Sequence, residues 1–169
     1  MLNGKIDQIA FISFSEEDTE EIKRSLSLQN DDWIEDIVVA EGWVRGERGV
    51  NKARLLFNYS NGIETEILQY LEGPNYAENF RAGQLCHIGM HYDGEGEVPS
   101  FIASIVQQVE TVSHTNEYQQ LHNRHYRYTI YDTYATHGVY MKVIERLEGP
   151  GIPANGDIEG LDGAAAVSA

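Results

Sequence analysis

Residues 61–74, with the sequence NGIETEILQYLEGP, decide the fold, because they align without a gap to residues 137–150, HGVYMKVIERLEGP. The two segments lie 76 positions apart and share a glycine at their second position and the block Leu-Glu-Gly-Pro at their ends. An upstream pair, residues 6–11 (IDQIAF) and 85–90 (LCHIGM), lies 79 positions apart. Two pairs in the same order at nearly the same offset predict a tandem repeat of one structural unit.

Each copy is predicted to form a strand, a helix and three further strands. Ser15 followed by three acidic residues is typical of a helix start, and Ile22 and Leu26 give this helix an apolar side. Asn61-Gly62 predicts a tight hairpin turn. The expected strands are residues 6–14, 33–39, 54–59 and 63–70 in the first copy, and 85–92, 109–114, 125–134 and 139–147 in the second, with the second helix around residues 98–107 and a matching turn at His137-Gly138.

The sequence therefore predicts an α+β fold of two βαβββ units, residues 4–74 and 84–150. Residues 151–169 contain Gly, Ala, Ser and acidic residues but no Lys or Arg. Such a composition lacks the apolar periodicity of a packed element, so we expect a flexible acidic tail there.

The composition excludes several classes of partner. The chain has 12 Lys+Arg against 27 Asp+Glu, a formal net charge of −15, which repels phosphate backbones and argues against a nucleic-acid partner. No apolar run reaches the roughly 18–20 residues that span a bilayer, and the N-terminus does not resemble a signal peptide. Cys86 is the single cysteine, so neither a disulfide framework nor a cysteine zinc cluster is expected. The simplest location is the cytoplasm.

Alternation along the predicted strands collects polar side chains on one face of the sheet. These are Gln8, Glu64, Glu66, His87, His91, Tyr140 and Lys142. The hairpin turn would place Phe57 beside Glu66 and Tyr59 beside Glu64. The same pairing in the second copy would place Tyr131 and Thr133 beside Lys142. This face is either exposed to solvent, as antiparallel sheets allow, or it lines a ligand pocket. The number of aromatic side chains favours a pocket with Phe57, Tyr59, Tyr70, His91, Tyr131 and Tyr140 as substrate-binding residues.

These features resemble the vicinal oxygen chelate superfamily, which includes glyoxalase I, bleomycin-resistance proteins and ring-cleaving dioxygenases. The resemblance is carried by the two units and by Gln8 in IDQIAF, Glu66 in TEIL and His87 in CHIGM, and it covers residues 4–148. It implies a cupped, mostly antiparallel sheet with the helices on its convex side. It also implies a divalent metal ion in the cup and a homodimer.

Carried over by position, the resemblance implies that Gln8, Glu66 and His87 are metal ligands for zinc, nickel, manganese or iron. The fourth ligand should lie 76 residues after Glu66, where this chain has Lys142. A protonated lysine only donates hydrogen bonds and does not bind a metal. Three interpretations follow: a metal held by three ligands, an ammonium that replaces the metal beside Glu66, or a lysine that acts as an acid or base.

Two functions are therefore expected from the sequence. The first is a glyoxalase-like lyase or isomerase for a small α-oxygenated carbonyl compound, with Glu66 and Lys142 as the catalytic residues. The alternative is a metal-free binding protein of the same fold that sequesters a small aromatic or cationic molecule.

Overall fold

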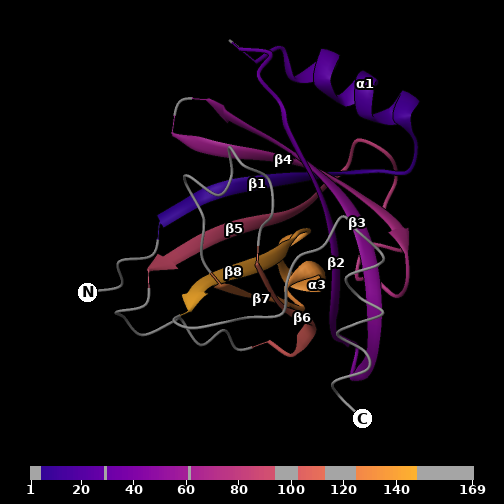
Figure 1. The fold of residues 1–169 in the computed structure, drawn as a ribbon, viewed down its shortest axis with the longest axis vertical. Coiled ribbons are helices and arrows are strands. Elements are labelled where there is room, and N and C mark those ends of the chain that lie inside the picture. Colours follow the sequence, from indigo (N-terminus) through magenta and orange to yellow (C-terminus); the bar gives the residue numbers. More distant parts are fainter. Residues whose placement is uncertain (1–4, 29, 61, 94–102, 113–124, 148–169) are drawn as a thin grey trace.

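The computed structural model describes residues 5–28, 30–60, 62–93, 103–112 and 125–147 (Figure 1). Within these ranges, eight strands form one closed barrel. The elements are β1 (Lys5–Ser13), α1 (Glu16–Leu26), β2 (Ile34–Val44), β3 (Glu47–Ser60), β4 (Ile63–Glu72), β5 (Leu85–Asp93), β6 (Ile105–Val112), β7 (His125–Tyr131), α3 (Tyr134–His137) and β8 (Tyr140–Leu147). None of the helices in these ranges is long and apolar enough to cross a membrane.

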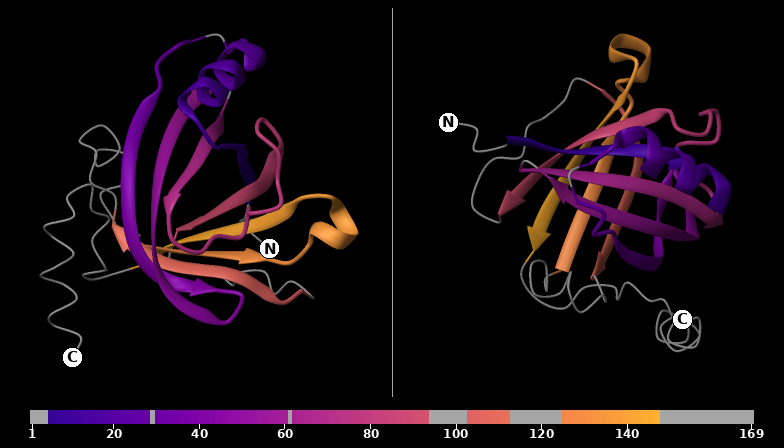
Figure 2. Two further views of the ribbon diagram at one scale, coloured as in Figure 1. Left: turned by 90° about the vertical axis from the view of Figure 1, so that its right-hand side faces the viewer. Right: turned by 90° about the horizontal axis from the view of Figure 1, so that it is seen from above.

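The strand order around the barrel is β1-β4-β3-β2-β6-β7-β8-β5, and β5 pairs with β1 to close it. β1–β4 and β5–β8 are parallel, whereas the other neighbouring pairs are antiparallel. The sheet is thus a closed mixed barrel, in place of the predicted cupped sheet. Figure 2 shows its strands curving around one interior. The order β1-β4-β3-β2 in the first half has its counterpart in β5-β8-β7-β6 in the second.

Helix α1 begins as the sequence predicts. The Ser15 side chain accepts a hydrogen bond from the Asp18 amide at 3.1 Å, and the acidic first turn favours the helix dipole. Its buried Ile22 packs with Leu56 and Ile67 on the outer face of the barrel, so this helix covers the convex side.

The helix predicted at residues 98–107 is not confirmed. Residues 105–107 belong to strand β6, and residues 94–102 lie outside the described residues. Ile105 and Val106 favour extended backbone, and pairing of β6 with both β7 and β2 outweighs the weak helical pattern. Among the described residues, the βαβββ order is therefore seen in the first copy and not in the second. The predicted tail also lies outside the described residues.

The register of the first hairpin is confirmed. Ser60 pairs with Ile63, and Phe57 and Tyr59 lie opposite Glu66 and Glu64. The two-residue connection needs positive φ, and Gly62 has φ of 73°.

The corresponding prediction for the second hairpin is wrong. Helix α3 separates β7 from β8, and Gly138, with φ of 69°, caps that helix. The His137-Gly138 sequence therefore ends a helical turn, and Lys142 pairs with Ile130 while Tyr131 pairs with Met141. Tyr131 consequently lies on the face opposite to Lys142 and packs with Met90 and Val143.

Strands β2 and β3 extend beyond the predicted ranges and meet at a tight turn in which Arg45 and Gly46 have φ of 50° and 84°. The polar residues in these extensions interrupt the alternation of apolar and polar residues from which strands are predicted. Arg48 and Glu41, for example, form an ion pair at 2.7 Å. This long hairpin reaches across to the second half of the barrel and pairs with β6.

The β2–β6 seam joins the halves through only three residue pairs among the described residues, of which one is Gly42 with Val109. A Cβ atom on Gly42 would lie 2.5 Å from the Gln108 carbonyl oxygen and 2.7 Å from Val109 Cγ2. Both distances are shorter than the van der Waals contact distance of a Cβ atom. The two strands can therefore approach this closely only because residue 42 has no side chain.

We predict that Gly42→Ala destabilises the barrel by about 1–3 kcal/mol, because the added methyl group forces the seam apart. Urea unfolding followed by circular dichroism measures the loss. The matched control is Gly46→Asn, where a Cβ meets nothing within 4 Å and asparagine tolerates positive φ. Equal stability of Gly42→Ala and wild type would contradict the close approach.

Candidate functional site

Three ionisable side chains from three strands meet inside the barrel. They are Glu66 on β4, His87 on β5 and Lys142 on β8, and their exposed fractions are 1%, 0% and 8%. Glu66 Oε2 lies 3.0 Å from Lys142 Nζ and 3.3 Å from His87 Nε2. Side chains from three separate strands thus converge on one carboxylate oxygen, and Lys142, 76 positions after Glu66, stands at the repeat position of Glu66.

Gln8 extends this cluster along β1. Its Nε2 donates to Glu64 Oε1, and its Oε1 lies 3.0 Å from His87 Nε2. Glu64 also accepts a hydrogen bond from the Tyr59 hydroxyl. Gly89 on β5 makes room for this amide, because a Cβ there would lie 2.5 Å from Gln8 Oε1.

The pKa values of Glu66 and His87 lie far from the ordinary values of these side chains. Burial raises the pKa of Glu66, but the charge of Lys142 and the hydrogen bond with His87 outweigh it and lower this pKa to about 2. Burial, together with the charge of Lys142, lowers the pKa of His87 to about 4 despite the neighbouring carboxylate. At neutral pH the cluster therefore contains a carboxylate, an ammonium and a neutral imidazole.

Two residues that the sequence analysis did not single out complete the site. Tyr76, in the connection between β4 and β5, is 1% exposed, and its hydroxyl is hydrogen-bonded to His87 Nδ1. Gln107 on β6 is fully buried and accepts from the Tyr76 backbone amide at 3.1 Å. Neither follows from strand alternation: Tyr76 lies outside the predicted strands, and Gln107 lies within the predicted helix.

Tyr128 on β7 is a third such residue. Lys142 Nζ lies 5.0 Å from the centroid of its ring, a cation–π distance. The corrected register explains this contact, because Tyr128 shares the inner face with Ile130, the partner of Lys142. Tyr128 thus lies where the sequence analysis expected Tyr131.

The other predicted pocket residues divide into two groups. Phe57, Tyr70 and Tyr140 lie on the inner side of the barrel: Phe57 is opposite Glu66, Tyr70 hydrogen-bonds Gln107, and Tyr140 packs against Tyr76. Tyr59 and His91 form the second group. The Tyr59 hydroxyl donates a hydrogen bond to Glu64, and His91 Nδ1 lies 2.8 Å from Asp7 Oδ1. The substrate-binding roles of all these residues stay predictions.

The donor spacing was tested against the metal ion that the resemblance implies. Gln8 Oε1 and Glu66 Oε2 lie 3.0 Å and 3.3 Å from His87 Nε2, which is compact enough to surround one ion with ligand bonds of about 2 Å. The ammonium of Lys142, however, already lies against Glu66 and would repel a divalent cation. In this arrangement the residues do not fit a metal ion. Among the described residues, no cluster of three or more His, Cys, Asp or Glu side chains is placed to hold one.

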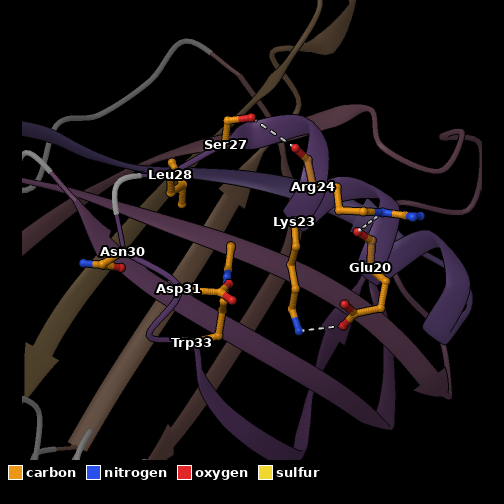
Figure 3. Close-up of a pocket in the computed structure, with 8 residues that line it drawn as sticks. All are labelled: Glu20, Lys23, Arg24, Ser27, Leu28, Asn30, Asp31 and Trp33. Atoms are coloured by element: carbon orange, nitrogen blue, oxygen red, sulfur yellow. Dashed lines mark hydrogen bonds and ion pairs between the residues drawn. The ribbon is translucent and has the colours of Figure 1, made fainter.

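A separate hollow of about 540 Å³ lies outside the barrel, between α1 and the residues that lead into β2 (Figure 3). Its charged groups largely neutralise each other. Lys23 forms an ion pair with Glu20 at 2.8 Å and lies 5.9 Å from the centroid of the Trp33 ring. None of the predicted site residues lines it, so we place the candidate site inside the barrel.

We predict that the free energy of unfolding falls as the pH drops from 6.5 to 2. Unfolded His87 takes up a proton near pH 6.5, whereas the folded state does so only near pH 4, which removes about 3 kcal/mol over that interval. Glu66 contributes stability above pH 4.5 that is lost as the pH falls toward 2. Urea unfolding at each pH measures the decline.

The contribution of the imidazole is isolated with His87→Gln, which should flatten the decline between pH 6.5 and 4. The control is His137→Gln, because His137 is exposed and its replacement should leave the wild-type profile unchanged. A profile of His87→Gln as steep as that of wild type would refute the burial of a neutral imidazole.

Comparisons with known proteins do not show which family this chain belongs to. No protein-family model matches the sequence, and a search of curated proteins finds no significant match. Among solved structures, a crystal structure of a glyoxalase family protein from Bacillus cereus is similar at 15% identity and a TM-score of 0.30, covering 88% of this chain and 99% of that chain. With so low a TM-score, this likeness carries no argument about the family, the fold or the site.

Proposed function

We propose that the protein binds a small molecule inside the barrel without a metal ion, and that the Lys142 ammonium replaces the charge of the metal. The observation that carries this proposal is the ion pair between Lys142 and Glu66, with 3.0 Å between Nζ and Oε2 and both side chains buried. It favours the interpretation that the Lys142 ammonium replaces the metal beside Glu66.

Stability alone does not account for this pair. Removing two charges from water costs several kcal/mol for each ion, and apolar side chains of similar volume are often at least as stabilising. Buried ionisable groups with shifted pKa values are, in contrast, frequent at functional sites. The lowered pKa values of Glu66 and His87 therefore support a role in binding or catalysis.

The surroundings of the pair suit a flat or cationic ligand. Phe57 lies opposite Glu66, and the ring of Tyr128 lies beside Lys142. Aromatic rings supply stacking and cation–π contacts. The net charge of −15 attracts cations to the protein as a whole. We propose on these grounds that the ligand is a small aromatic or cationic molecule.

The second candidate is the metal-dependent lyase or isomerase that the sequence analysis named first. The convergence of Gln8, Glu66 and His87 favours it, whereas Lys142 opposes it and would have to move away from Glu66. The proposed homodimer and cytoplasmic location apply to either candidate.

The proposal predicts a ligand whose binding is independent of divalent ions. Thermal unfolding is measured with a panel of small aromatic and cationic compounds in the presence of a chelator, alongside the metal content of protein purified without a metal-affinity column. We expect at least one compound to raise Tm equally with and without the chelator. Stabilisation only after a divalent ion is added would overturn the proposal and favour the lyase or isomerase.

Matched variants locate the binding site. Lys142→Gln should abolish the shift in Tm for an aromatic ligand that contacts the ammonium, and it should enlarge the shift for a cationic ligand, which the ammonium repels. Lys23→Gln removes a lysine that pairs with Glu20 outside the barrel and should keep the shift. Loss of binding in both variants would point away from the barrel interior.

Lys142→Glu should convert the site into a metal site. The replacement puts a second carboxylate beside Glu66, so the variant is expected to be less stable than wild type without metal. Zinc, nickel or manganese should then stabilise it through linkage, since carboxylate and imidazole ligands suit these ions. Thermal unfolding of both proteins with and without each ion decides the question. A variant that gains no more from metal than wild type does would show that the site is assigned wrongly.

A further inference from the structure

Tyr76 is buried although it lies in the connection between the two copies. It belongs to the connection from β4 to β5, yet its side chain is among the largest that are fully buried. Its hydroxyl reaches His87 Nδ1, on the side of the imidazole that faces away from Gln8 and Glu66. A side chain from outside the strands thus contacts the centre of the candidate site.

The position of Tyr76 is held by three further contacts. Its ring packs edge-on against Tyr70 and Tyr140, with centroid distances of 6.1 Å and 5.2 Å and interplanar angles of 88°. Its backbone amide donates to Gln107 Oε1 at 3.1 Å. Because ring and backbone are both fixed, the hydroxyl is directed at His87 before any ligand binds.

The hydrogen bonds of Gln8 decide which nitrogen of His87 carries the proton. The amide nitrogen of Gln8 donates to Glu64 Oε1, so the amide oxygen of Gln8 points the other way. Gln8 Oε1 then faces His87 Nε2 at 3.0 Å, and Glu66 Oε2 lies 3.3 Å from the same nitrogen. Both oxygen atoms are acceptors, so these two contacts are favourable only when His87 Nε2 bears a hydrogen.

We propose that Tyr76 is a positioning residue of the candidate site, which donates a hydrogen bond to His87 Nδ1 and so holds the imidazole with its N–H directed at Gln8 and Glu66. Burial keeps His87 neutral at pH 7, so Nδ1 carries a lone pair and accepts. The Cys86 thiol, which lies 3.3 Å from both the Tyr76 oxygen and the Ala10 carbonyl, can donate to that carbonyl and leaves the tyrosine proton to His87.

The proposal has a chemical consequence for the site. An imidazole whose Nε2 bears hydrogen donates to Glu66 and has no lone pair there for a metal ion. Tyr76 and Lys142 thus act on the same carboxylate from two sides, Lys142 directly and Tyr76 through His87. This inference concerns the geometry of the proposed binding site, but it does not require the ligand to be known.

The test is a long-range ¹H–¹⁵N correlation spectrum of the full chain labelled with ¹⁵N, recorded at pH 7 without ligand. The His87 signals are assigned by their loss in His87→Gln. We expect Nε2 at the shift of a protonated nitrogen and Nδ1 at that of an unprotonated nitrogen that accepts a hydrogen bond. A proton on Nδ1 in the wild type overturns the proposal, and this measurement needs no variant of Tyr76.

Tyr76→Phe removes the hydroxyl and keeps the ring. The Nδ1 signal should move toward the value of a free unprotonated nitrogen, while Nε2 stays protonated because Gln8 and Glu66 still require its hydrogen. Tyr70→Phe is the matched control, since Tyr70 binds Gln107 and not His87, and it should leave both signals in place. An unmoved Nδ1 signal in Tyr76→Phe overturns the role of Tyr76. Failure to find a ligand in the thermal screen would overturn the proposed function alone.

Discussion

Glu66 is buried inside a closed barrel, and Lys142 supplies the cation beside its carboxylate. Burial by itself raises the pKa of Glu66, and the charge of Lys142 reverses the direction of the shift. The carboxylate that results lies 3.3 Å from His87 Nε2, and the same nitrogen lies 3.0 Å from Gln8 Oε1. The arrangement of the inner polar side chains therefore depends on one ion pair.

The position of this pair follows from the repeat. Strands β4 and β8 are the last strands of the two copies, and each runs parallel to the first strand of its own copy, β1 or β5. β1 and β5 pair with each other, so the matching faces of the two copies meet inside the barrel. Equivalent positions then face one interior, and an acid in one copy with a base in the other forms a pair of opposite charges.

Alternation and the turn sequence were sufficient to predict several inner residues of the two copies. Gln8, Glu66 and His87 follow from strand periodicity alone, and the pairing of Phe57 with Glu66 follows from the Asn-Gly turn. The same logic failed at Tyr131, because a helical turn at residues 134–137 shifted the register. Tyr76 could not be predicted, since its burial depends on a connection that has no periodic pattern and on packing against Tyr70, Tyr140 and Gln107.

The closure of the barrel could not be predicted from the sequence either. The β2–β6 contact includes a short approach at Gly42, and an isolated glycine within a strand predicts close packing without identifying the partner strand. Long-range pairing of this kind is decided by tertiary structure and not by local preference.

The sign of the charge at position 142 has consequences beyond stability. Two apolar side chains could fill the space of Lys142 and Glu66 at no cost in folding free energy, but they would remove the carboxylate beside His87 Nε2. An acidic residue at position 142 would require an external cation to balance two carboxylates. With lysine, the balancing charge is covalently attached and present at any metal concentration. The lysine thus makes the inner charge balance independent of metal supply, and in that respect the site differs most from the metal centre that the sequence resemblance implies.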